Sequence, residues 1–220
     1  MRLNTHALFA LLAAFFWMDT AMAIEEPKYE VLISQAPYEL RLYAPVLVAE
    51  TLIEGDMDAA SSKGFRLIAD FIFGNNLVAG SDKAAKIAMT APVTVEPKSS
   101  KIAMTAPVTL EPQSGHSAIA EARQWRVHFV MPSQYTLATI PKPNNSAVTL
   151  RELPRKYVVV NSYAGFNSMA RVQEKTNDTV AWAQQQSLKI EGTPQLSRYD
   201  PPWTLPMFRG NEIMVEVAAP

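Results

Sequence analysis

The sequence predicts an α+β fold in which a mostly antiparallel sheet or barrel carries two helices. Short runs rich in β-branched and aromatic residues surround a helical pattern in the order strands–helix–strands, and this order occurs twice along the chain. No linker long enough to separate two domains is present in the 220 residues. We therefore expect residues 24–220 to form a single pseudo-symmetric domain.

The first 23 residues are typical of a secretory signal. Arg2 gives a positive start, Ala7–Trp17 is continuously apolar, and Ala21 and Ala23 are small residues suited to a cleavage site. The apolar run of 11 residues is much shorter than the roughly 20 residues that span a bilayer, which disfavours a membrane anchor. We expect cleavage after Ala23, an exported protein that is periplasmic or secreted, and no membrane span thereafter.

Three strands are expected at the start of the mature chain, within residues 29–54. The runs YEVLISQ, YELRLY and VLVAETLIEG are rich in β-branched and aromatic residues. The Pro37 and Pro45 positions separate these runs, because proline interrupts a strand.

A helix is expected over residues 58–73. Apolar residues recur there at helical spacing, and they are Phe65, Leu67, Ile68, Phe71 and Ile72. Asp56 or Asp58 can cap the first turn by accepting its backbone N–H groups. The segment Gly74–Asn76 ends the helix, since glycine and asparagine tolerate the left-handed conformation found after a helix.

Residues 86–112 contain an internal duplication. Lys86–Pro97 has the sequence KIAMTAPVTVEP and Lys101–Pro112 has KIAMTAPVTLEP, so 11 of 12 positions match. Apolar residues alternate in both copies, which predicts strands. The copies could form a hairpin joined by residues 98–100, or one copy could be a tolerated surface insertion. Two copies are too few for a solenoid, so the repeat is a local duplication.

The second half of the chain repeats the order of the first. A second amphipathic helix is expected from a cap at Asn167 or Ser168 to about Gln186. Alternating apolar patterns predict strands before and after it, over residues 125–131, 147–153, 156–163, 195–199 and 212–217.

Composition and motifs exclude several functions. The balance of 20 Lys+Arg against 21 Asp+Glu indicates no nucleic-acid partner, because phosphate binding depends on clustered cations. The chain has no Cys and therefore no disulfide, thiolate nucleophile or Cys-ligated zinc. Motifs of common nucleotide-binding enzymes and hydrolases are missing, and His116 and His128 are too few for a multi-histidine metal site.

Several segments resemble the SOUL/haem-binding protein family. The sequence KIAMTAPV, present in both copies of the duplication, is similar to the hallmark of that family. Further segments are similar to its other signatures: Tyr38–Tyr43 to an early Tyr-Glu-x-Arg-x-Tyr strand, Gly74–Asn76 to the end of helix one, Phe129–Pro132 to a strand end, and Tyr199–Pro202 and Arg209–Glu212 to two late motifs.

The resemblance implies a pseudo-two-fold, distorted antiparallel β-barrel flanked by two amphipathic helices, a fold similar to effector-binding domains of transcription regulators. It also implies non-enzymatic, non-covalent binding of haem or another tetrapyrrole in an apolar cleft beside helix one. Two positions depart from the family pattern. Leu42 stands where some members carry a possible axial histidine, and Gly210 replaces the second arginine of a late motif, which removes one partner for a propionate.

A tetrapyrrole needs a flat apolar slot and cations for its propionates. We expect Phe65, Leu67 and Ile68 to provide the slot, with core packing as the alternative role for each. Arg66 and Arg209 are the candidate cations, because a guanidinium forms charge-assisted hydrogen bonds with a carboxylate. The alternative for Arg209 is to brace a loop.

Four further residues are candidates for contact with the ligand. Met89 and Met104 occupy the same place in the two copies of the duplication, and methionine serves either as core filler or as a haem ligand. Tyr199 lies in a late motif and can instead pack a loop. His128 is a possible axial ligand if its face of strand 125–131 lines a cleft.

Three functions remain open from the sequence. The first is an exported haem- or tetrapyrrole-binding protein that acts in sequestration, buffering or trafficking. The second is a binding module for other amphipathic small molecules. The third is a hydrolase that uses a carboxylate in the cleft as general base, tuned by burial.

Overall fold

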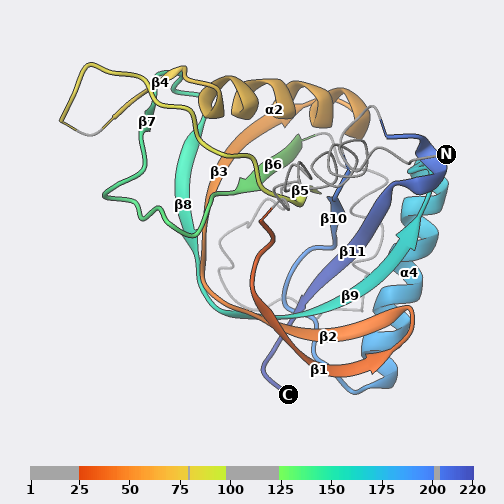
Figure 1. Ribbon diagram of the computed structural model, residues 1–220. Coiled ribbons are helices and arrows are strands. Elements are labelled where there is room, and N and C mark those ends of the chain that lie inside the picture. The colour runs from red at the N-terminus through yellow and green to blue at the C-terminus, as the bar shows by residue number, and fades with distance from the viewer. Residues whose placement is uncertain (1–24, 79, 98–123, 201–203) are drawn as a thin grey trace, which may run out of the picture.

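The computed structural model describes residues 25–78, 80–97, 124–200 and 204–220 (Figure 1). The elements in chain order are β1 (Tyr29–Gln35), β2 (Tyr38–Tyr43), β3 (Val46–Glu54), α2 (Met57–Ile72), β4 (Asn76–Leu77), β5 (Val93–Pro97), β6 (Gln124–Val130), β7 (Lys142–Pro143), β8 (Thr149–Leu153), β9 (Lys156–Ala164), α4 (Met169–Gln185), β10 (Gln195–Arg198), the 3-10 helix η2 (Pro206–Phe208) and β11 (Gly210–Val217). The two helices were predicted to within one or two residues, whereas β4, β7 and η2 were not predicted.

One curled sheet organises the fold. Its nine strands have the order β1-β2-β9-β11-β10-β5-β6-β3-β8, and every neighbouring pair is antiparallel. Figure 1 shows α2 along the top of this sheet and α4 along its right-hand side. The α+β class, the antiparallel sheet and the two flanking helices are therefore confirmed.

The sheet has the pseudo-two-fold symmetry that the sequence predicted. With β1 left out, exchange of β2 with β8, β3 with β9, β5 with β10 and β6 with β11 gives the same strand order in reverse. The pseudo-axis runs between β5 and β10, where Thr94 pairs with Ser197. β3 and β9 each end at a glycine with positive φ, Gly55 and Gly165, and each is followed by a helix.

The two helices begin at equivalent side-chain caps. The Asp56 carboxylate accepts a hydrogen bond from the Ala59 backbone N–H at 2.8 Å, and the Ser168 hydroxyl accepts one from the Arg171 N–H at 3.3 Å. Each bond satisfies a backbone donor that has no partner within the helix. Of the alternatives left open by the sequence, Asp56 and Ser168 are the caps.

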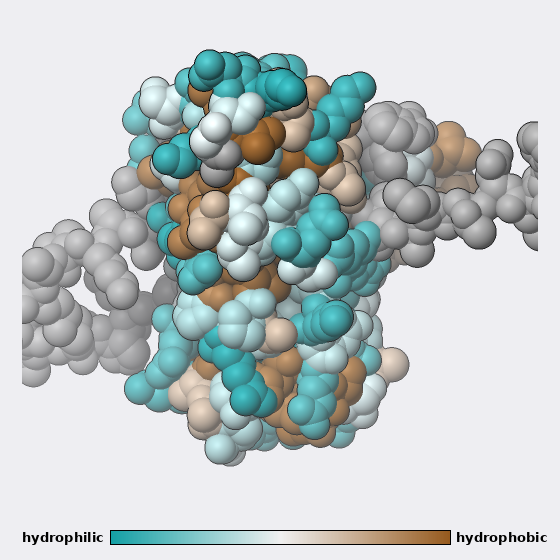
Figure 2. Space-filling view, turned by 60° about the vertical axis from the view of Figure 1, so that its left-hand side comes forward, coloured by the Kyte–Doolittle hydropathy of each residue, from teal (hydrophilic) through white to brown (hydrophobic). Residues whose placement is uncertain are grey.

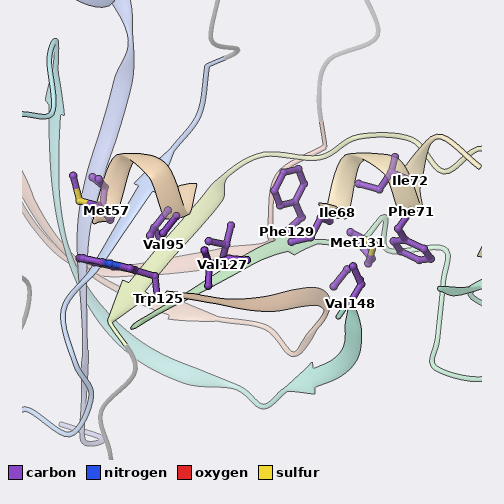
Figure 3. Close-up of a cluster of buried hydrophobic side chains, with 14 of the residues drawn as sticks. Met57, Ile68, Phe71, Ile72, Val95, Trp125, Val127, Phe129, Met131 and Val148 are labelled. Atoms are coloured by element: carbon purple, nitrogen blue, oxygen red, sulfur yellow. The ribbon is translucent and has the colours of Figure 1, made fainter. Parts of the chain in front are cut away.

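The main core lies between α2 and the sheet. Figure 3 shows Ile68, Phe71 and Ile72 of α2 in one cluster with Phe129 of β6 and with Met131 and Val148. Gly64 allows this approach, because a Cβ at Gly64 would lie 2.6 Å from the side chain of Val127. A second cluster lies beneath α4, where Trp182 stacks on Tyr38 with ring centroids 5.5 Å apart.

The first copy of the duplication crosses the centre of the sheet. Its strand begins only at Val93, and residues 86–92 form an irregular segment rather than the predicted strand. Both edges of β5 are paired, with β6 on one side and β10 on the other. The hairpin alternative is therefore wrong, because no edge of β5 remains for the second copy. The second copy, with Met104, lies outside the described residues.

Figure 2 shows a face covered mostly by hydrophilic residues, with apolar residues visible between them. Within the described ranges, neither helix has the length and apolar character needed to cross a bilayer.

Candidate functional site

A cleft of about 590 Å³ lies beside the pseudo-two-fold axis. The first turns of α2 line the cleft, and so does the loop of residues 165–168, which leads into α4. Val93 of β5 and Arg198 of β10 contribute from the two central strands. The volume lies in the range typical of small-molecule sites.

One side of the cleft is apolar. The Phe65 ring packs on Phe129 of the main core with centroids 5.5 Å apart, and Val93 is half-buried beside it. Phe166, also in the lining, leaves 63% of its surface exposed. Exposed apolar side chains also occupy the neighbouring η2 segment, where Phe208 is 70% exposed. A flat apolar ligand could bury these surfaces.

Three guanidinium groups line the same cleft. Arg198 donates hydrogen bonds to Asp58 Oδ1 and Ser61 Oγ, both at 3.3 Å. Arg209 donates from Nε to the Thr204 carbonyl at 2.8 Å. Arg66 is exposed and, among the described residues, has no hydrogen bond or ion pair. Because two aspartates accompany these three arginines in the lining, the cleft carries a net positive charge.

An amide network holds the loop that faces α2. Gly165 has a φ of +109°, which turns the chain at the end of β9. The Asn211 side chain donates to the Gly165 and Arg209 carbonyls and accepts from Asn167 Nδ2 at 2.5 Å. Tyr163 in turn donates its hydroxyl to Asn167 Oδ1 at 2.7 Å, and burial raises the pKa of Tyr163 to about 12. The loop is thus fixed by partners on β9 and β11.

The structure brings together three of the predicted ligand contacts. Phe65, Arg66 and Arg209 line the cleft. Ile68 is fully buried in the main core, and Leu67 and Met89 pack against that core as half-buried residues. None of these three is among the residues that line the cleft.

Tyr199 lies in a second hollow, of about 500 Å³, together with Glu212 and Arg41. The Tyr199 hydroxyl donates to the Glu212 carboxylate, and Arg41 Nη1 donates to the other oxygen of Glu212 at 3.0 Å. Burial raises the pKa of Tyr199 well above its ordinary value, and the charge of Glu212 adds to this effect. Tyr199 therefore remains a neutral donor in this network.

His128 is buried and does not line the cleft. It alternates on β6 with Val127 and Phe129, which face the main core, so it points to the other side of the sheet. Burial lowers its pKa to about 3, with further contributions from Lys156, Arg151 and Arg126. Its imidazole is neutral at pH 7. Leu42, at the position of the possible axial histidine, is also buried.

Sequence reasoning missed several residues of the cleft, including Arg198, Asp58 and Phe166. Arg198 is a single charge in a short strand, and no local pattern marks it. Within the described ranges, no group of three or more His, Asp or Glu side chains has the arrangement needed to hold a metal ion.

Comparison with known proteins identifies the family. A family model described as SOUL heme-binding protein matches residues 24–100 and 96–216, and each matched segment contains one copy of the duplication. The chain belongs to the SOUL heme-binding protein family. The resemblance found in the sequence is thus confirmed, and non-covalent haem is the cofactor that this family implies.

Relatives of this SOUL protein agree with the assignment. Heme-binding protein 2 of Homo sapiens is 30% identical over 162 residues, which span 70% of this chain and 67% of the human protein. Heme-binding protein 2 of Mus musculus is 31% identical over 141 residues, which span 63% of this chain and 57% of the mouse protein.

Solved structures share the fold of this SOUL protein at low identity. The C-terminal domain of EcmrR has a TM-score of 0.55 and 13% identity, with 87% of this chain and 99% of that chain covered. A hydrolase from Listeria innocua has a TM-score of 0.51 and 12% identity, with 85% and 94% covered. Both likenesses concern the fold alone.

Proposed function

We propose that this chain is an exported, non-enzymatic protein that holds haem or a related tetrapyrrole in the cleft between α2 and residues 165–168. The observation that carries the proposal is the pairing of an apolar wall with three guanidinium groups in one cleft. A tetrapyrrole with propionates has the matching chemistry, because its ring is flat and apolar and its carboxylates are anionic. Sequestration, buffering or trafficking would each use such a site.

The residues of the cleft fit this ligand. Phe65 and Phe166 both offer aromatic surface to the cleft, where a flat ring gains apolar contact. Arg66 is available to form a charge-assisted hydrogen bond with a propionate, since its guanidinium has no partner among the described residues. Arg209 lies in the same lining and supplies a second cation.

A binding role also agrees with the carboxylates of the cleft. Asp58 accepts a hydrogen bond from Arg198, and Asp200 accepts one from the Gly210 backbone N–H at 2.6 Å. Both carboxylates thus hold protein groups in place. This arrangement favours recognition over use of either group as a general base.

Recognition in this cleft would depend on the ring and its carboxylates rather than on the metal. No His, Met or Tyr side chain is among the described residues that line the cleft. We therefore expect protoporphyrin without iron to bind about as tightly as haemin. His128→Ala should leave the position of the Soret band unchanged, because His128 is buried away from the cleft.

The experiment is a haemin titration of the purified protein, followed by Soret absorbance. Arg66→Ala should weaken binding by about ten- to a hundredfold, because a hydrogen bond to a charged group contributes about 1.5–3 kcal/mol. Arg155→Ala is the matched control, since Arg155 is also exposed and without a partner among the described residues but lies outside the cleft. Phe166→Ala should also weaken binding, with the exposed Phe73→Ala as its control. Equal effects of site and control variants would argue against this cleft, and no saturable binding would argue against haem.

A further inference from the structure

Residues 86–97, the first copy of the duplication, occupy a slot that runs through the centre of the fold. β5 within this segment lies between β6 and β10, next to the pseudo-two-fold axis. Ile87, Ala91 and Val95 are 3%, 6% and 1% exposed, respectively. The Ile87 N–H donates to the Ile72 carbonyl at 2.8 Å, and the Thr90 hydroxyl donates to the Val130 carbonyl.

The second copy carries almost every side chain that this slot uses. Each residue of the segment 86–97 has its counterpart 15 positions later, and the two differ only at Val95 and Leu110. The Thr94 hydroxyl, 2.9 Å from the Ser197 hydroxyl, has an identical counterpart in Thr109. Apart from Val95, every buried side chain with which the first copy fills the slot has an identical counterpart in the second copy.

The hydrogen bonds that hold the residue just before the slot do not depend on the side chain of that residue. Asn76 donates from Nδ2 to the Ala85 carbonyl at 2.8 Å, and its Oδ1 accepts from the Ala85 N–H at 2.9 Å. Both bonds involve only the backbone of Ala85. Ser100, the counterpart of Ala85, has the same backbone groups.

We propose that either copy of the duplication can occupy the slot, so that the chain has two alternative folded forms. In the form described above, residues 86–97 lie between β6 and β10. In the other form, residues 101–112 take that place with Val108 at the position of Val93 and Met104 at that of Met89. The chain thus carries a spare copy of its own central strand.

Chain connectivity permits both forms. Twenty-six residues, 98–123, connect the first copy to β6, and 11 residues, 113–123, would connect the second copy. At the same time, the connection from β4 to the copy in the slot grows from residues 78–85 to residues 78–100. The entropy of loop closure changes only with the logarithm of loop length, so one shorter loop and one longer loop nearly offset each other.

The single difference between the copies sets the direction of the equilibrium. Val95 is packed in the main core at 1% exposure, and Leu110 at the same position would add a methylene group to a filled site. Such overpacking is unfavourable, which makes the form with residues 86–97 the major one by roughly tenfold. The match of the family model to two segments, each with one copy, agrees with both copies being competent.

The exchange does not rest on the proposed function. Val93 is the residue of the first copy that lines the cleft, and its counterpart Val108 has the same side chain. A ligand bound in the cleft therefore meets the same surface in both forms. A failure of haemin binding and a failure of strand exchange are separate results.

One test places a charge in each copy. Ile87→Asp buries an aspartate in the first copy, and Ile102→Asp makes the matched change in the second. If the copies exchange, Ile87→Asp lowers the urea midpoint only modestly, Ile102→Asp has little effect, and the double variant does not fold, as judged by circular dichroism. If only the first copy can fill the slot, Ile87→Asp alone is as damaging as the double variant, and the proposal is overturned. Leu110→Val in the Ile87→Asp background should raise the midpoint again, because it removes the overpacking.

A second test traps each form in the folded protein. The chain has no Cys, so an introduced pair gives an unambiguous disulfide. Thr94 pairs directly with Ser197 on adjacent strands, and the pair Thr94→Cys with Ser197→Cys should therefore form a crosslink on oxidation. Thr109→Cys with Ser197→Cys should also crosslink, as shown by peptide mass analysis, and more slowly. Ser99→Cys with Ser197→Cys is the control, and a Thr109 pair that crosslinks no faster than this control overturns the proposal.

Discussion

The two halves of the sheet place different chemistry at equivalent positions. Glu212 of β11 pairs with Ser197, and His128 of β6 pairs with Thr94, on either side of the pseudo-two-fold axis. Both side chains are buried. The symmetry of the backbone therefore creates two matching places for a buried ionisable group, and the neighbouring residues decide the charge of each.

The neighbours of Glu212 support a carboxylate. Its two oxygens accept hydrogen bonds from Arg41, Ser162 and Tyr199, so the charge is paired and the lone pairs are used. Burial alone would lower the pKa of the Arg41 guanidinium, but the charge of Glu212 and the Tyr43 hydroxyl reverse that effect and raise it. This half contains a closed ionic network.

The neighbours of His128 support a neutral group. The side chains that influence its charge are the cations of Lys156, Arg151 and Arg126, and its Nδ1 has no hydrogen-bond partner among the described residues. The comparison shows that a buried polar position is stable in either charge state, provided that the surroundings match it.

The largest expected effect comes from breaking the ionic network. Glu212→Leu should lower the free energy of unfolding by about 3–5 kcal/mol, because it removes one of the two carboxylates paired with the buried Arg41 guanidinium, leaving Glu39, and takes the acceptor from the Tyr199 hydroxyl. His128→Leu is the matched change in the other half and should alter stability at pH 7 by less than about 1 kcal/mol, since it removes a group with an unpaired nitrogen. Urea denaturation measures both. Equal losses would mean that the two positions are energetically alike.

The helices of the two halves differ in how closely they approach the sheet. Gly64 is the eighth residue of α2, and its counterpart in α4 is Thr176, which is fully buried. Gly64→Ala gains about 1 kcal/mol in helix propensity but places a Cβ 2.6 Å from Val127. We expect a net loss of about 2 kcal/mol in thermal or urea unfolding, because overpacking, at about 3 kcal/mol, outweighs propensity. A stabilised Gly64→Ala variant would show that α2 can move away from β6 without penalty.

The neutral histidine makes one half sensitive to acid. The folded pKa of His128 is about 3 and the unfolded value is about 6.5, so below pH 6.5 the unfolded chain binds a proton that the folded protein does not. Stability from this group is therefore complete above pH 6.5 and is lost as the pH falls toward 3. Between pH 6.5 and 5 the loss should reach about 2 kcal/mol. His128→Leu should abolish that part of the loss, and urea curves at both pH values that shift equally in the two proteins would contradict the assignment.

The smallest expected difference concerns the two helix caps. Asp56→Ala should cost about 1–2 kcal/mol, because a charged oxygen accepts a short bond of 2.8 Å at the start of α2. Ser168→Ala should cost about 0.5–1 kcal/mol, since its bond to the Arg171 N–H is neutral and longer, at 3.3 Å. Thermal unfolding of the two variants under the same conditions gives the ranking. A greater loss for Ser168→Ala would reverse the interpretation of the caps.

The elements of the fold could be predicted because their signals are local. Alternating residues in 38–54 and 156–163 mark strands, and the apolar stripe before Gly74 marks α2. The same stripe did not show which of its residues face the core, so Ile68 was grouped with Phe65 although the two lie in different environments. Helical periodicity shows which face of a helix is apolar, but not which part of that face is buried in the core and which part borders a cleft.

The rest of the cleft depends on pairing between distant segments. Arg198 reaches the cleft because β10 pairs with β5, a contact between residues about one hundred positions apart. Asn211 fixes the loop at Gly165 from β11. Neither of these two contacts produces a pattern in the local sequence. The family resemblance, in contrast, led to Arg66 and Arg209 without any knowledge of the strand order.

The ion pair between Arg198 and Asp58 connects the two halves across the cleft. Arg198 belongs to β10 in the second half, and Asp58 belongs to the first turn of α2 in the first half. A ligand carboxylate that binds Arg198 competes with Asp58 for the same guanidinium. Occupation of the cleft would then release the start of α2, and the backbone amides of that turn would exchange with deuterium faster in the complex than in the ligand-free protein. Ligand binding would then lower the protection of these amides from exchange, whereas at most binding surfaces a ligand raises it.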